Sequence, residues 1–138
     1  MDAHKPAAIR KKYSAALMSD QKWKKFYLAM AEHGSQLCGI EYRFTDTDDV
    51  LTGIAPSASQ VWDTAIDDPV DQAGGPIEYK HIESLAIPRV FRYHAYKNGP
   101  VVERGQDIET FLAALERIGQ FPIALTDTHV VLSAYKKA

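Results

Sequence analysis

The stretch DIETFLAALERIG, residues 107–119, carries the clearest structural signal in the chain. Its apolar side chains recur three and four residues apart, the spacing that places them on one face of an α-helix. They are Ile108, Phe111, Leu112, Leu115 and Ile118. Asp107 is placed to cap the first turn, and Gly119 is placed to end the helix. We therefore predict an amphipathic helix near residues 107–118 that covers a hydrophobic core.

Segments with the two-residue period of β-strands lie on both sides of this helix. They cover residues 38–44, 85–87, 90–96, 101–104, 121–126 and 130–135. Asn98-Gly99 is a strong turn signal between two of them, although Pro100 favours a longer loop there or a pair of strands at the edge of the sheet. Asp127-Thr128 is the predicted turn of the last pair. Because most of these strands follow one another along the chain, we expect an antiparallel sheet of about five to six strands.

The first third of the chain predicts two further helices, over residues 6–18 and 20–33. Their apolar stripes comprise Ile9, Tyr13, Ala16 and Leu17 in the first and Trp23, Phe26, Tyr27 and Met30 in the second. Ser19 is placed to cap the second helix and Gly34 to end it. We expect an N-terminal helical hairpin packed on one face of the sheet. The predicted fold class is therefore α+β.

Length and composition are those of one globular domain over residues 1–138. The chain is 46% hydrophobic and 25% charged, which is ordinary for a folded domain. Its longest apolar run has six residues, over positions 26–31, so we expect no membrane span and no secretion leader. The lone Cys38 has no second cysteine to pair with, and a cytoplasmic location is expected.

Residues 45–79, which we call the acidic segment, contain eight acidic residues and no Lys or Arg. The acids are Asp46, Asp48, Asp49, Asp63, Asp67, Asp68, Asp71 and Glu78. The segment reads as irregular, and large apolar residues such as Trp62 interrupt the acids. Acidic side chains steer a basic partner, and a large apolar side chain anchors it. We therefore predict a surface for a basic protein partner.

The predicted binding residues of this surface are Trp62, Asp63, Asp67, Asp68 and Asp71. A structural alternative stays open for all of them. In that alternative Trp62 pins the acidic segment to the sheet, and the acids face water or are neutralised by lysines of the N-terminal helices. The oligomeric state is left undecided.

Three features together are similar to a family of small bacterial proteins of unknown function. They are Lys22-Trp23 in an amphipathic helix, Trp62 after a loop, and GPIEYKHIESLAIP over residues 75–88. The similarity extends over most of the chain from about Tyr13. It implies a cytoplasmic bacterial protein of one domain and provides no activity to transfer. By analogy of class, we expect a non-catalytic binder comparable to immunity proteins and antitoxins.

An enzymatic alternative depends on Glu78-Tyr79-Lys80, ten residues after Asp68. This arrangement resembles metal-dependent nucleases of the PD-(D/E)xK type, in which two carboxylates hold Mg²⁺ and the lysine orients the attacking water. In that reading Asp68, Glu78 and Lys80 are catalytic, and the protein hydrolyses a phosphodiester.

Other ligands are considered on the same residues. Asp63, Asp67, Asp68 and Asp71 offer oxygen ligands for a loose cation site. The close spacing of Asp46, Asp48 and Asp49 lacks the glycine and glutamate of an EF-hand loop. The five histidines are dispersed and show no zinc spacing, so no cofactor is expected.

Nucleic acid is not the expected partner. Residues 1–33 have a net charge of +4 and contain aromatic side chains, but these aromatics belong to the predicted buried stripes. The acidic segment has a net charge of −8 and repels phosphate. The basic residues of the N-terminal third are therefore interpreted as a solvated face.

Overall fold

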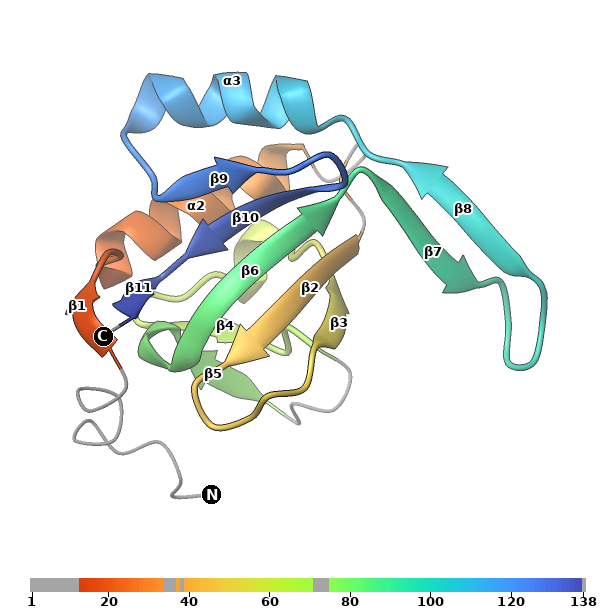
Figure 1. Ribbon diagram of the computed structural model, residues 1–138, viewed down its shortest axis with the longest axis horizontal. Coiled ribbons are helices and arrows are strands. Elements are labelled where there is room, and N and C mark those ends of the chain that lie inside the picture. Colours follow the sequence, from red (N-terminus) through yellow and green to blue (C-terminus); the bar gives the residue numbers. More distant parts are fainter. Residues whose placement is uncertain (1–12, 34–36, 38, 71–74, 138) are drawn as a thin grey trace.

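The computed structural model describes residues 13–33, 37, 39–70 and 75–137. Its fold is α+β, with two helices packed beside a five-stranded antiparallel sheet (Figure 1). The strand order is β3-β2-β6-β10-β9. These strands are β3 (Leu51–Ile54), β2 (Gly39–Phe44), β6 (Ile82–Pro88), β10 (His129–Ser133) and β9 (Ile123–Leu125). The helices are α2 (Asp20–Glu32) and α3 (Ile108–Ile118).

Both of these helices confirm predictions made from the sequence. In α3, Ile108, Phe111 and Leu115 are buried, and Gly119 follows the last turn. Asp107 caps α3, because its carboxylate accepts a hydrogen bond from the Thr110 N–H at 3.2 Å. Ser19 caps α2 in the same way and accepts from the Lys22 N–H at 3.1 Å. Local capping and a single apolar face therefore determine both elements.

The predicted helix over residues 6–18 is wrong where the structure describes it, and so is the helical hairpin. Residues 13–16 form the short strand β1 (Tyr13–Ala16), which pairs antiparallel with β11 (Tyr135–Lys137). The remaining positions, 6–12, lie outside the described residues. Tyr13 explains the difference: its ring stacks on Tyr135 at 4.6 Å and its hydroxyl donates to Glu83 at 2.7 Å. These distant contacts override the helical spacing of the local sequence.

The core lies between α2, α3 and the inward face of the sheet. On β2 the side chains of Ile40, Tyr42 and Phe44 are buried, whereas Arg43 is exposed, as the two-residue period requires. The hydroxyls of Tyr27 on α2 and Tyr42 on β2 are 2.8 Å apart, so two buried phenols satisfy each other. Helix and sheet are thus joined by polar as well as apolar contacts.

The acidic segment contains more regular structure than its sequence indicated. It supplies the edge strand β3, the 3₁₀ turn η1 (Ala58–Gln60), and the hairpin of β4 (Ala65–Asp67) and β5 (Pro76–Glu78). Val61, Ile66 and Val70 are buried in the core cluster and fix the segment to the body of the protein. The 3₁₀ turn η2 (Tyr79–His81) then leads into β6.

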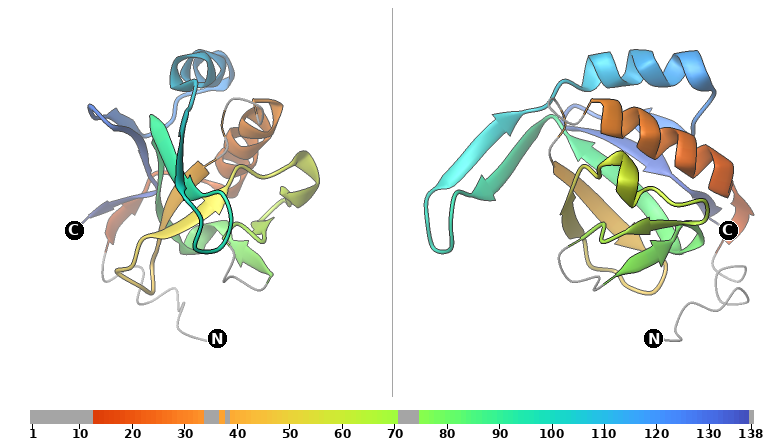
Figure 2. Two further views of the ribbon diagram at one scale, coloured as in Figure 1. Left: turned by 90° about the vertical axis from the view of Figure 1, so that its right-hand side faces the viewer. Right: turned by 180° about the vertical axis from the view of Figure 1, so that it is seen from behind.

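A second hairpin, formed by β7 (Val90–His94) and β8 (Val101–Gly105), extends away from the body of the protein (Figures 1 and 2). We call residues 90–105 the arm. The predicted hairpin around Asn98-Gly99 is confirmed, and so is the longer loop: the strands pair up to His94 and Val101. The predicted final hairpin is also confirmed, because β9 and β10 pair across residues 126–128.

Candidate functional site

Trp62 is displayed on a fixed backbone at the centre of the acidic segment. Its carbonyl oxygen accepts a hydrogen bond from the Tyr79 hydroxyl at 2.6 Å, and its N–H donates to the Ala65 carbonyl at 2.9 Å. The residue itself is 45% exposed. The sequence left open whether Trp62 pins the segment to the sheet. In the structure, its neighbours Val61 and Ile66 are buried, whereas Trp62 is partly exposed.

Tyr79 connects this displayed tryptophan to the core. Its ring stacks with Trp23 at 6.1 Å and with Tyr27 at 5.9 Å, both from α2. Burial, together with the nearby negative charges of Asp20 and Asp63, raises the pKa of Tyr79 to about 12. The phenol is therefore protonated at neutral pH, and its hydroxyl donates a hydrogen bond to the Trp62 carbonyl. A rigid support of this kind lowers the conformational entropy that binding would cost.

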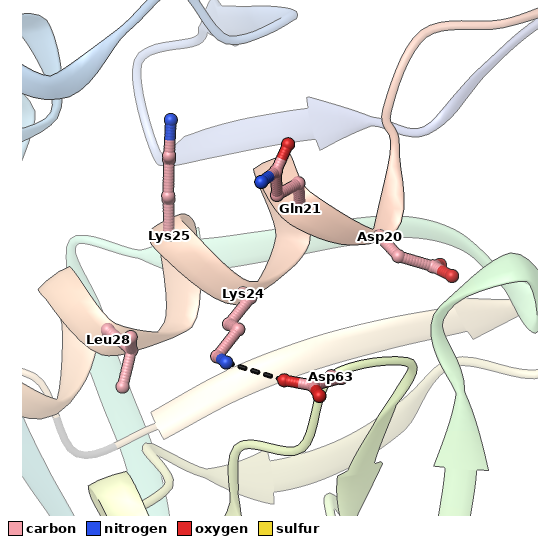
Figure 3. A pocket seen from close by; sticks show the side chains of 6 residues that line it. All are labelled: Asp20, Gln21, Lys24, Lys25, Leu28 and Asp63. Carbon is pink, nitrogen blue, oxygen red and sulfur yellow. Dashed lines mark hydrogen bonds and ion pairs between the residues drawn. The ribbon is translucent and has the colours of Figure 1, made fainter.

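Asp63 is exposed and forms an ion pair with Lys24 of α2, with 2.5 Å between Nζ and Oδ1 (Figure 3). The hydrogen bond and positive charge of Lys24 lower the pKa of the Asp63 carboxyl group. The structural alternative, in which lysines of the N-terminal helices neutralise the acids, thus applies to this residue. An open groove of about 530 Å³ runs between α2 and the loop beside the pair. It is lined by Asp20, Gln21, Lys24, Lys25, Leu28 and Asp63.

Asp67 and Asp68 lie at the far end of β4 from Trp62. Asp67 is partly buried, and its carbonyl accepts from the Gln60 side chain at 2.9 Å. Asp68 is exposed and has a φ of 45°, a left-handed conformation that aspartate tolerates better than most residues. Asp71, the remaining predicted binding residue, lies outside the described residues. The structure therefore distributes the acids along one hairpin rather than gathering them at one point.

The three residues of the hydrolase alternative are not brought together as a metal site. Glu78 lies opposite Ala65 in the β4–β5 ladder, whereas the Asp68 N–H bonds to the Gly75 carbonyl. The backbones of the two residues are thus three ladder positions apart, roughly 10 Å along the strands. Glu78 instead lies 3.7 Å from Lys80 in an exposed pair. Among the residues that the structure describes, no three His, Cys, Asp or Glu side chains form a group that could hold a metal ion.

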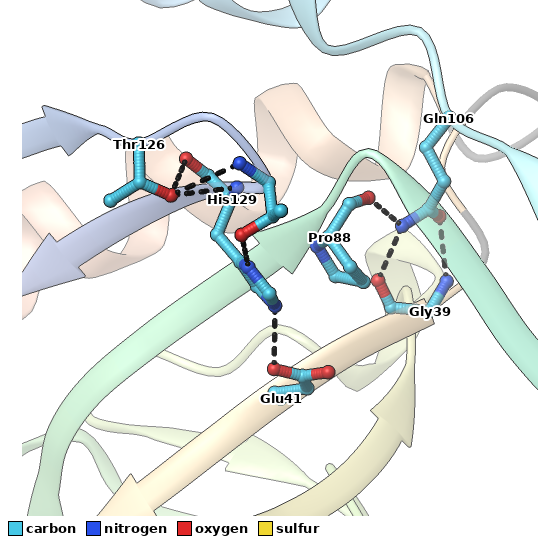
Figure 4. A network of polar contacts seen from close by, with 7 residues as sticks. Gly39, Glu41, Pro88, Gln106, Thr126 and His129 are labelled. Atoms are coloured by element: carbon cyan, nitrogen blue, oxygen red, sulfur yellow. Dashed lines mark hydrogen bonds and ion pairs between the residues drawn. The ribbon is translucent and has the colours of Figure 1, made fainter.

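The structure also shows a polar chain that the sequence did not reveal. His129 on β10 contacts Glu41 on β2 at 3.0 Å and the Thr128 hydroxyl at 2.7 Å (Figure 4). Glu41 and His129 border a shallow groove of about 270 Å³ on the sheet face opposite the helices. Glu41 and His129 are 88 positions apart in the chain, so no local spacing could indicate their contact.

Hydroxyl, imidazole and carboxylate follow one another here in the order used by nucleophilic hydrolases. Such a site also needs backbone N–H groups that are available to stabilise an oxyanion. The N–H groups of Thr128 and His129 both donate to the Thr126 hydroxyl, at 3.3 and 2.9 Å. These two N–H groups are therefore already engaged, and the network connects β10 to β2 across the intervening β6.

Comparisons with family models, curated proteins and solved structures found no match to this chain. The similarity to small bacterial proteins of unknown function stays a prediction. Within residues 13–33, 37, 39–70 and 75–137, no helix combines the length and apolar content that a membrane span requires.

Proposed function

We propose that the protein is a non-catalytic interaction module whose acidic segment binds a basic protein partner. The observation that supports this most directly is the partly exposed Trp62, held by two backbone hydrogen bonds beside exposed carboxylates. Tryptophan is prominent among the residues that dominate binding energy at protein interfaces. The Trp62 side chain is partly exposed, and its backbone is held by hydrogen bonds to the body of the protein. This combination suits an anchor for a partner.

The charge around Trp62 specifies the partner. Seven of the eight acids of the segment lie among the described residues. Lys24 forms an ion pair with Asp63, the residue that follows Trp62. Lys80 and His81 lie 3.7 and 3.8 Å from Glu78. Exposed carboxylates in such number accelerate the encounter with a basic surface and disfavour an acidic one. A role like that of an immunity protein or antitoxin, which neutralises a basic protein, is the most specific form of this proposal.

Affinity capture from a lysate of the source organism tests the proposal with matched variants. The Trp62→Ala variant removes the anchor, and a variant with Asp63, Asp67 and Asp68 changed to Asn removes three charges. Asparagine is chosen because it tolerates the positive φ of residue 68. Control variants carry Leu125→Ala, which removes an exposed apolar side chain, or Glu116→Gln with Asp127→Asn.

We expect wild type and both controls to retain a basic protein that mass spectrometry identifies and that both site variants lose. Retention should weaken as salt is raised, since exposed charges are screened over about 8 Å near physiological ionic strength. If the captured proteins are the same for all variants, the acidic segment is not the binding surface. An acidic partner would also contradict the proposal.

A further inference from the structure

The arm has the features of a docking element. Among the described residues, β7 and β8 pair only with each other, and they lie outside the five-stranded sheet. An isolated two-stranded hairpin is marginally stable in water, so a free hairpin gains stability when another surface covers it. The views in Figure 2 show the arm reaching away from the helices and the sheet.

The base of the arm is firmly attached. The Phe91 ring packs directly on Gly39 of β2, where an added Cβ would lie only 2.0 Å from it. The Gln106 side chain accepts from the Gly39 N–H at 2.8 Å and donates to the carbonyls of Gly39 and Pro88, each at 2.9 Å (Figure 4). The direction of the arm is therefore set by the body of the protein.

The arm as a whole, from its base to its tip, is apolar and basic. Val90, Tyr93, Tyr96 and Val101 are large apolar residues left exposed, with Tyr96 at 67% and Val101 at 57%. Residues 90–105 contain three basic residues and one acid, a net charge of +2. Arg92 pairs with Glu103 at 2.6 Å within the arm. Such a surface fits an acidic counterpart that also offers apolar side chains.

The same chain carries such a counterpart at the start of the acidic segment. Asp48 and Asp49 are exposed in the turn between β2 and β3, and Val50 is exposed beside them. Ile54 is exposed at the other end of β3, where it pairs with Gly39. The arm extends away from its own body (Figures 1 and 2), so this turn must be contacted in another molecule. When each of two copies offers both surfaces, one twofold arrangement satisfies both contacts at once.

We propose that the arm docks on a second copy of this chain, against the β2–β3 turn and β3, in a reciprocal dimer. This inference rests on the proposed function in one respect: it uses the acidic segment as a recognition surface. It assigns the 48–54 part to a second copy and leaves Trp62 and its neighbouring acids to the basic partner. Loss of one interaction can therefore be observed without loss of the other.

Sedimentation velocity of the full chain over a concentration series, at low and at high salt, tests the dimer. We expect a concentration-dependent dimer at low salt that weakens at high salt. Tyr96→Ser and Lys97→Glu should each raise the dimer dissociation constant about tenfold or more, as truncation of a central interface residue does. Leu125→Ser and Lys25→Glu, matched changes at exposed positions outside the arm, should leave it unchanged.

A charge exchange identifies what the arm contacts. The Lys97→Glu variant and a variant carrying Asp48→Lys and Asp49→Lys should each associate poorly alone, and their mixture should form a heterodimer because both contacts become attractive. A wild type that stays monomeric at low salt overturns the proposal. The proposal is also overturned if the arm variants leave the dimer dissociation constant unchanged, or if the mixture of the two charge variants does not associate. Trp62→Ala should dimerise normally, so a failure of partner capture with the dimer intact affects only the proposed function.

Discussion

Trp23 and Trp62 place the same side chain in two contrasting regions of the molecule. Trp23, on α2, is 2% exposed and packs against Phe26, Tyr27 and Tyr79. Trp62, in the acidic segment, is 45% exposed, and the segment is fixed through its neighbours instead. The region of α2 and the sheet thus uses its aromatic residues for stability. The acidic segment keeps its largest aromatic side chain available at the surface.

The two regions also differ in where their charged side chains lie. The inward face of the sheet and the helices buries apolar side chains, with polar exceptions such as the Tyr27–Tyr42 pair that are hydrogen-bonded. In the acidic segment, buried Val61, Ile66 and Val70 hold the chain while carboxylates face outward. Stability and recognition can therefore be altered separately, which the following changes test in order of decreasing effect.

Replacing each tryptophan by alanine should give the largest contrast. Trp23→Ala removes a fully packed aromatic side chain and should lower the free energy of unfolding by about 3–5 kcal/mol. Trp62→Ala should lower it by distinctly less, about 1–2 kcal/mol, since nearly half of the Trp62 surface already contacts water. Denaturant titration measures both. Equal losses would show that Trp62 is a structural pin after all.

Helix α3 offers the next comparison, between Leu115 and Leu112. Leu115 is buried and Leu112 only partly so. Leu115→Ala should cost about 2–5 kcal/mol, and Leu112→Ala should cost distinctly less because a partly exposed site leaves a smaller cavity. The two midpoints of denaturation, measured side by side, check this. A larger loss of stability for Leu112→Ala than for Leu115→Ala would contradict the packing of α3 described above.

The attachment of the arm should be sensitive to a single methyl group. Gly39→Ala would force a Cβ against the Phe91 ring, an overpacking that typically costs about 1–3 kcal/mol. Gly105→Ala is the matched control, since its Cβ would meet no atom within 4 Å. Thermal denaturation of both variants is the measurement. Restoration of stability by Phe91→Ala in the Gly39→Ala background would confirm the cause, and an unaffected Gly39→Ala variant would contradict it.

Alkaline pH should destabilise the core through its tyrosines. Burial raises the pKa values of Tyr27, Tyr42 and Tyr79 in the folded protein, that of Tyr79 to about 12. The unfolded chain loses these protons near pH 10, so above that pH the folded state binds more protons and stability falls as pH rises. The contribution of Tyr79 is complete below about pH 10 and is lost by about pH 12. A free energy of unfolding that stays constant over this interval would contradict the burial of these phenols.

Neutralising the acids should have the smallest effect on stability. Changing Asp63, Asp67 and Asp68 to Asn should leave the thermal midpoint nearly unchanged, because exposed charges and surface ion pairs contribute little to folding. Differential scanning calorimetry at low and high salt checks this. A large drop in the midpoint would mean that these carboxylates support the fold.

Elements determined by interactions between residues close in sequence were predicted correctly, whereas an element determined by contacts between distant residues was not. Helix α3 and the arm hairpin carry their signals locally, in Asp107 and Gly119 and around Asn98-Gly99, and both were predicted. The strand at Tyr13 depends on Glu83 and Tyr135, which lie far along the chain. The local sequence there has helical spacing, but the contacts with these distant residues determine a strand.

The site shows the same division. The charge of the acidic segment and the presence of Trp62 could be read from the sequence. The Lys24–Asp63 ion pair and the Glu41–His129 contact join residues 39 and 88 positions apart, so only the fold reveals them. Trp62 is partly exposed because its neighbours Val61 and Ile66 are the residues that enter the core. Composition alone does not determine which of these residues is buried.

The association rate with the captured partner, measured against salt concentration by stopped flow, tests the central claim most directly. Electrostatic steering by the acidic segment should make the wild-type rate fall steeply as salt rises. The variant with Asp63, Asp67 and Asp68 changed to Asn should associate more slowly at low salt and show a shallower salt dependence, with its fold intact. Wild-type and variant rates that coincide at every salt concentration would show that these acids do not recognise the partner.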